Sequence, residues 1–304
     1  MAHSDVPARA HQAGDRLHGA ADGVQREVHR AQRMGRQASA NPWAVGLMRL
    51  GYAAKGLVYV ILGGLALAAA LGHGGETTDT KGAVRALALG PAGHTLLLVV
   101  AVGLFGYALW GILDALLDLD GNGTSLKGII SRVAVFVIAL GYIGLGLGAL
   151  QIGLGTGSGG SSSNQETHDL TARLLQAPFG VALVVALGLV LLGVACALAY
   201  LAWSAQFMQP MKHAETSATV EHTLRWLGRA GYGALAVVTA EIGVFLIVAA
   251  LHRNAGESRG MGAALATLAA QPYGHILLAV VALGLIAFGA FSLAEARYRR
   301  ISSR

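Results

Sequence analysis

Six long apolar runs constrain this chain more than any other feature of its sequence. As an α-helix, each run is long enough to cross the roughly 30 Å hydrocarbon core of a bilayer. The runs are continuously apolar rather than alternating, which excludes transmembrane β-strands. The sequence therefore predicts an all-α, polytopic membrane helix bundle with six transmembrane helices. The runs cover residues 50–71, 93–117, 130–153, 179–204, 230–251 and 274–296.

Charge and cysteine content exclude several other classes of protein. Only 12% of the residues are charged, about half the share in soluble domains. The net charge of +6 lies in a tail and in loops, so we expect no nucleic-acid partner. Cys196 is the single cysteine, which leaves no intrachain disulfide and no cysteine-based metal site. We expect no metal and no cofactor.

The distribution of lysine and arginine predicts the orientation of the bundle. With the N-terminus inside, the inner segments carry sixteen of these residues and the outer loops carry five. Positive charge stays on the cytoplasmic side of membrane proteins. We therefore expect a multi-pass protein of the plasma membrane with both termini cytoplasmic (N-in/C-in). The first 40 residues contain no apolar core of a signal peptide.

Residues 1–48 form a basic tail with two possible structures. A stripe from Leu17 to Ala31 could make a weak amphipathic helix that lies on anionic lipid. The stripe is poor in large apolar residues, so a solvated and partly disordered cytoplasmic tail is the other reading. Anionic lipid is thus an expected partner of the tail, and the sequence identifies no protein partner.

An internal repeat organises the rest of the chain. A Pro-x-Gly motif recurs at residues 91–93, 178–180 and 272–274, and the RLGY of residues 49–52 returns as RAGY at 229–232. Each unit holds one span, an outer loop with a short helical pattern, and a second span. Units with two spans share one orientation and can be related only by rotation about the membrane normal. We predict a pseudo-threefold arrangement of repeats 49–120, 130–205 and 229–298.

Two further expectations follow from the repeat. The short helical pieces in the outer loops should lie flat on the outer face or tuck over the mouth of the bundle. Gly144 and Gly148 form a G-x-x-x-G motif, which suggests close packing of the third span.

The first unit resembles a known family. It reads GYAAKGLVYV over 51–60, DTKGAVRALA over 79–88 and GLFGYALW over 103–110, followed by Asp114. This pattern is similar to the actinobacterial integral membrane family called domain of unknown function 1206, which consists of three two-span repeats. The resemblance covers roughly 49–298 and is loosest in the second unit. It implies the topology given above and no particular activity.

Glu241 is the most unusual residue, because it lies midway along the fifth apolar run. A carboxylate at that depth costs at least about 2.5–3.5 kcal/mol on insertion scales and usually faces the bundle interior. It is either a protonatable site on a path for ions or protons, or a buried neutral acid that is hydrogen-bonded to a threonine or to a tyrosine such as Tyr59.

Three other charged residues in the spans complete the candidate ligand or proton site. Lys55 lies in the first span and is expected to snorkel to the inner headgroups or to pair with Asp114. A role in binding substrate or lipid phosphate is the alternative. Asp114 and Glu295 match each other in the repeat and lie near the inner ends of their spans. For Glu295 we expect a pair with Arg299, four residues later.

The remaining motifs give little support for catalysis. Residues 118–123 read DLDGNG, like the start of a calcium loop, but Ile129 stands where the bidentate glutamate belongs. His94 and His275 match in the repeat and lack a third ligand. We therefore predict a non-enzymatic bundle that binds lipid or a membrane partner. The alternative is a small transporter or channel for an ion, proton or small solute that uses Glu241.

Overall fold

The structure, a computed structural model, describes residues 42–72, 79–89, 92–118, 126–156, 163–211 and 218–298. These residues are all-helical. Residues 1–41 of the basic tail predicted over 1–48 lie outside the described residues, and residues 42–48 belong to the first helix. Most of the DLDGNG motif and Arg299 also lie outside the described residues. The helices are α2 (Pro42–Ala70), α3 (Thr80–Ala88), α4 (Gly93–Leu117), α5 (Leu126–Gly153), α6 (Ser163–Gln176), α7 (Gly180–Ser204), η1 (Gln206–Met211), α8 (Ala218–Leu251), η2 (Ala255–Glu257), α9 (Met261–Ala270) and α10 (Gly274–Tyr298).

Six of these helices are long and apolar enough to cross a membrane: α2, α4, α5, α7, α8 and α10. This confirms the predicted number and approximate positions of the spans. The short helices α3, α6 and α9 precede the second span of each unit, as the sequence predicted. The chain is thus a multi-pass membrane protein.

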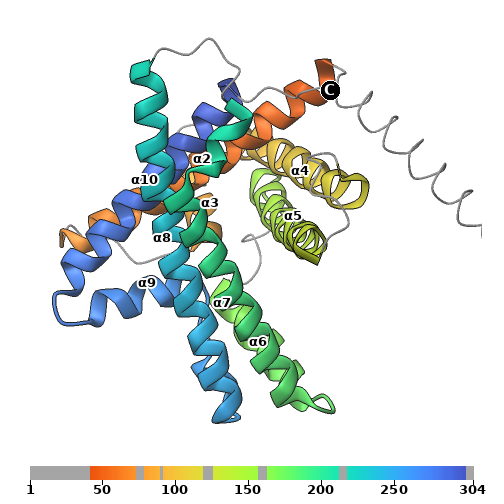
Figure 1. The fold of residues 1–304 in the computed structure, drawn as a ribbon, viewed down its shortest axis with the longest axis vertical. Coiled ribbons are helices and arrows are strands. Elements are labelled where there is room, and N and C mark those ends of the chain that lie inside the picture. The colour runs from red at the N-terminus through yellow and green to blue at the C-terminus, as the bar shows by residue number, and fades with distance from the viewer. Residues whose placement is uncertain are drawn as a thin grey trace, which may run out of the picture.

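The six spans associate mainly as three pairs. The most extensive contacts join α10 to α2, α7 to α8, and α4 to α5. In Figure 1, α2 and α10 run together on a diagonal, and the α7/α8 pair crosses that direction. Smaller contacts join α2 to α4 and α8 to α10. Each pair therefore combines the second span of one unit with the first span of another.

The second unit differs from the other two. Its spans α5 and α7 do not pack along each other in the described part of the chain, whereas α2 packs on α4 and α8 on α10. We call this side of the bundle, between α5 and α7, the open side. On α5, a Cβ added at Gly141 or at Gly144 would meet no atom within 4 Å. The close helix contact predicted for Gly144 is therefore wrong, because no other helix reaches it.

Glycines lie where the paired helices approach most closely. A Cβ at Gly188 of α7 would lie 2.9 Å from the carbonyl oxygen of Gly243 on α8, and one at Gly243 would lie 3.0 Å from that of Gly188. A Cβ at Gly103 of α4 would lie 2.8 Å from the carbonyl oxygen of Leu50 on α2. Small residues let the backbones meet, which drives helix association in lipid.

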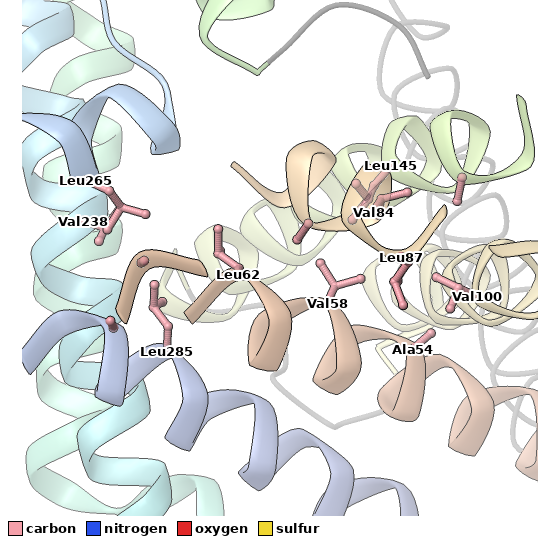
Figure 2. Close-up of a cluster of buried hydrophobic side chains, with 14 of the residues drawn as sticks. Ala54, Val58, Leu62, Val84, Leu87, Val100, Leu145, Val238, Leu265 and Leu285 are labelled. Carbon is pink, nitrogen blue, oxygen red and sulfur yellow. The ribbon is translucent and has the colours of Figure 1, made fainter. Parts of the chain in front are cut away.

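Two of the three short helices that precede the second spans insert into the bundle. Figure 2 shows Val84 and Leu87 of α3 and Leu265 of α9 among the side chains of the spans. Val84 and Leu265 are almost completely buried. By contrast, Leu170 of α6 is 53% exposed. The expectation that these helices tuck over the bundle mouth thus fits α3 and α9 better than α6. The inserted helices belong to one core: Val58, Leu62, Val84, Leu97, Leu104, Leu145, Val238, Leu265, Leu278 and Leu285.

Candidate functional site

Lys55 lies in an aromatic nest between α2, α4 and α10. Its ammonium Nζ is 4.7 Å from the ring centre of Phe288, 5.0 Å from that of Tyr107 and 5.4 Å from that of Tyr52. Nζ also donates a long hydrogen bond of 3.5 Å to the hydroxyl of Tyr107. Only 6% of Lys55 is exposed. The rings stabilise the cation through their negative faces, so Lys55 does not snorkel to the headgroups as one reading expected.

Asp114, predicted as a partner of Lys55, and Glu295, predicted to pair with Arg299, are both buried. Asp114 of α4 is 4% exposed and Glu295 of α10 is 5% exposed. Lys55 is attracted electrostatically to Glu295. A carboxylate in an apolar interior needs such a counter-charge or hydrogen bonds. The structure therefore brings Lys55 and Glu295 into one buried charged group, and the pairing of Lys55 with Asp114 stays a prediction.

Tyrosines extend the nest toward the other spans. The rings of Tyr107 and Tyr142 pack edge to face, with 4.7 Å between their ring centres. Tyr142 of α5 also shares a side-chain hydrogen bond with Tyr59 of α2. The ring centres of Tyr59 and Phe288 lie 4.9 Å apart, also edge to face. Edge-to-face geometry is the favoured aromatic contact. Tyr59, considered above as a partner of Glu241, is instead part of the Lys55 nest.

The short helix η1 packs on α8 and α10 near the end of α7. The ring of Phe207 stacks on that of Tyr232 of α8, with 5.1 Å between ring centres. It also packs edge to face on Phe291 of α10, with 5.0 Å between ring centres. Phe207 and the adjacent Met208 are buried. The start of the connection between α7 and α8 thus packs against the bundle.

Glu241 lies apart from this nest and has a different partner. The charge attracted to it is Arg259, from the segment between η2 and α9. The guanidinium of Arg259 stacks 4.5 Å from the ring centre of Phe245 and donates a hydrogen bond to the hydroxyl of Thr267. The Oε2 atom of Glu241 is buried and has no hydrogen-bond partner among the described residues. The structure therefore separates Glu241 from Lys55 and Glu295.

Two matched arginines cap the spans of the preceding units. Arg132 of α5 donates to the carbonyl oxygens of Ala115 (2.7 Å) and Leu116 (2.8 Å) at the end of α4. Arg229 of α8 donates to the carbonyl oxygen of Trp203 (3.1 Å) at the end of α7. The last carbonyls of a helix lack internal partners, and cations there also complement the helix dipole. Each arginine thus joins two consecutive units.

Sequence reasoning missed several of these residues. Arg259 and Thr267 belong to the segment between α8 and α10 rather than to a span, so a search of the spans for polar partners could not find them. The arginine caps were detectable, because Arg49, Arg132 and Arg229 occupy matching positions in the three units. His94 and His275 are exposed, and the described residues contain no cluster that could hold a metal ion.

The fold and the site define a polytopic helical membrane protein with a buried cation–aromatic centre. The chain belongs to the family Domain of Unknown Function (DUF1206), which matches it three times, over residues 50–118, 131–205 and 230–299. It is 34% identical over 261 residues to the uncharacterized protein YxxB of Bacillus subtilis, covering 86% of this chain and 93% of that protein. The resemblance noted from the sequence is therefore confirmed, and it extends to a Bacillus protein. No solved structure matches the chain.

Proposed function

We propose that this chain is a non-enzymatic protein of the plasma membrane whose helix bundle binds lipid on its open side, with both termini in the cytoplasm. The observation that carries the proposal is the contrast between the centre and the side of the bundle. Leu62, Leu104, Leu265 and Leu285 fill the centre and are completely buried. The side between α5 and α7 is not closed by any span of the described chain.

The helix pairing supports a pseudo-threefold arrangement with an incomplete second unit. The second span of each unit packs along the first span of the next: α4 on α5, α7 on α8, and α10 on α2. Rotation of the units about the membrane normal would produce this pattern. In such a ring, α5 and α7 would also be neighbours, and their separation opens the ring toward the bilayer. Lipid is the molecule available there to cover the apolar faces.

Orientation is supported by charge and by aromatic residues. Trp203 at the end of α7 and Trp226 near the start of α8 are 84% and 58% exposed. Trp226 has Arg229 beside it, with the guanidinium 5.8 Å from the ring centre. Exposed tryptophans with nearby arginines are typical of a membrane–water interface. We expect this end to be cytoplasmic, which alkaline phosphatase fusions at residue 304 (inactive) and within 157–162 (active) would test.

Native mass spectrometry of the full chain tests the lipid proposal. We expect at least one phospholipid to remain bound after detergent washing that strips bulk lipid. Gly144→Leu should lower this occupancy, because the new side chain occupies space beside the exposed surface of α5 without meeting protein atoms. Gly64→Leu on α2 is the matched control, since Gly64 also has no atom within 4 Å of its Cβ position. Equal lipid occupancy in both variants, or none in the wild type, would contradict the proposal.

A second candidate is transport of an ion, proton or small solute through Glu241. One observation favours it: a carboxylate oxygen of Glu241 is buried without a hydrogen-bond partner among the described residues, and Arg259 reaches toward it from the outer segment. Flux in proteoliposomes would decide, with wild type compared to Glu241→Gln. Wild-type flux above that of empty liposomes, and lost in the variant, supports transport. Flux at the empty-liposome level in both removes it.

A further inference from the structure

A small pocket lies at the end of the bundle where α8 ends and α7 begins. It has a volume of about 300 Å³ and is set between α6, the start of α7 and the turn after α8. The size is at the lower end for ligand sites, enough for a headgroup but not for two acyl chains. Four of its lining residues are apolar, namely Ala172, Leu175, Val181 and Ala255, and the other two are Gln176 and Arg253.

The backbone at Arg253 is left-handed, with φ of 51°. The amide of Arg253 donates to the carbonyl oxygen of Ala250 at 3.2 Å, and that of Asn254 donates to Ala249 at 2.9 Å. This pair of hydrogen bonds is the Schellman motif that ends many helices, in which the left-handed position is usually glycine. A residue with a Cβ is strained there.

The other two units have glycine at the matching position. The first span of unit one ends at Gly72 (φ 72°), and that of unit two ends at Gly155 (φ 68°). Gly155 and Thr156 repeat the hydrogen bonds of Arg253 and Asn254, to Ile152 (3.0 Å) and Gln151 (3.0 Å). The third unit therefore carries a strained arginine where its copies carry unstrained glycine. Such strain in one copy alone suggests that the side chain has a role.

The turn after Arg253 already uses the nearest acidic residue. Glu257 Oε2 lies 2.7 Å from Nδ1 of His252, and Glu257 Oε1 accepts a hydrogen bond of 3.3 Å from the side chain of Asn254. The Asn254 side chain also accepts from the amide of Gly256 at 3.0 Å. These contacts fix the turn and engage the carboxylate. No carboxylate of the described residues forms an ion pair with Arg253.

We propose that this pocket binds the phosphate group of a membrane lipid, with Arg253 as the anion-binding residue. A guanidinium matches a phosphate in charge and in planar hydrogen-bond geometry. The Gln176 side chain supplies the second polar contact, and the apolar wall faces the glycerol end of the lipid. The inference rests on the proposed function in taking lipid as the ligand, but the pocket is lined by α6, the start of α7 and the turn after α8, with no residue of α5.

Arg253→Gly is the informative variant, because it installs the residue that the other two units use. The variant removes the guanidinium and relieves the strained backbone, so it should fold at least as well as the wild type. The control is Arg173→Gln, which removes one positive charge from α6 at an exposed position that does not line the pocket.

The experiment is a titration of the full chain, in an uncharged detergent, with a short-chain phosphatidylglycerol and separately with inorganic phosphate. Isothermal calorimetry gives the dissociation constants. We expect Arg253→Gly to weaken lipid binding by about 10- to 100-fold, the size of one lost hydrogen-bonded charge contact. Arg173→Gln should leave binding unchanged, and inorganic phosphate should bind much more weakly than the lipid.

Three results would overturn the assignment. Equal lipid affinity of wild type and Arg253→Gly removes Arg253 from the site, while the proposed lipid binding at the open side stands. An equal loss in Arg173→Gln shows general attraction of charge rather than a pocket. Inorganic phosphate that binds as tightly as the lipid shows that the apolar wall contributes nothing, so a lipid is not the ligand. The lipid proposal for the open side is tested separately, by the lipid occupancy of Gly144→Leu and Gly64→Leu in native mass spectrometry.

Discussion

Gly56 of α2 and Gly289 of α10 face each other at a point of backbone contact. A Cβ at Gly56 would lie 2.7 Å from the carbonyl oxygen of Gly289, and a Cβ at Gly289 would lie 2.6 Å from that of Gly56. Real Cβ atoms do not approach a backbone oxygen so closely, so an added methyl group must push the helices apart. The close approach of α2 and α10, the most extensive helix pair of the bundle, thus requires glycine at both positions.

We expect Gly289→Ala to destabilise the bundle by about 1–3 kcal/mol or more, because overpacking a tight contact displaces backbone. The same change at Gly64, which has no atom within 4 Å of its Cβ position, should be neutral or slightly stabilising through higher helix propensity. Thermal unfolding in detergent measures both. Equal melting temperatures for the two variants would show that α2 and α10 do not meet at Gly289.

Lys55→Met should destabilise the protein by about 3 kcal/mol, the usual cost of removing one partner of a buried charged group. The change removes the cation that attracts Glu295 and leaves the carboxylate in the core. The double variant Lys55→Met/Glu295→Gln should regain part of the loss, so the two effects are not additive. Unfolding of the four proteins in a double-mutant cycle measures this. Strict additivity would mean that the two residues do not interact.

We expect loss of the Arg132 cap to lower stability more than loss of the Arg229 cap. Arg132→Gln should lower stability by about 1.5–3 kcal/mol, because it removes charged hydrogen bonds to Ala115 and Leu116. Arg229→Gln should cost less, since one longer bond to Trp203 is lost. Arg132→Lys should rescue only partly, because an ammonium does not have the fork geometry of a guanidinium. A smaller loss for Arg132 than for Arg229 in unfolding experiments would contradict the structure.

Replacing Arg253 by glycine and Gly155 by arginine should change the stability of the protein in opposite directions. Arg253→Gly relieves a left-handed backbone and should raise stability by about 1 kcal/mol, whereas Gly155→Arg should lower it by a similar amount. Both changes are read as shifts in melting temperature in the absence of added lipid. A loss of stability in Arg253→Gly would mean that the arginine side chain makes structural contacts that outweigh the strain.

Much of the fold was predictable from the sequence because its signals are local. Apolar runs long enough for a bilayer predicted the six spans, and the Pro-x-Gly motifs predicted where the second spans begin. Gly180 and Gly274 begin α7 and α10, and a Cβ at either would lie 2.1 Å from a carbonyl oxygen of the preceding helix. Glycine is required there by contact, which explains why the motif recurs in each unit.

The pairing of the spans and the location of the charged partners were not predictable. Nothing local distinguishes Gly56, which meets another helix, from Gly144, which meets none. Likewise, Glu241 and Lys55 looked like members of one site because both are charged residues in spans. The structure separates them, because the charge attracted to Glu241 is Arg259, from the segment between η2 and α9, whereas Lys55 is surrounded by aromatic rings. These contacts depend on which helices pack together, and that pairing joins residues far apart in the sequence, so local sequence patterns do not predict it.

The pairing of α2 with α10 has a consequence for biosynthesis. α2 is synthesised before its main helix partner, α10, with four other spans between them in the sequence. Until α10 is inserted, the glycine-lined face of α2 is covered by lipid or by the insertion machinery, and α8 also lacks one of its neighbours. A chain truncated before α10 would therefore leave the glycine-lined face of α2 without its helix partner and would remove one neighbour of α8.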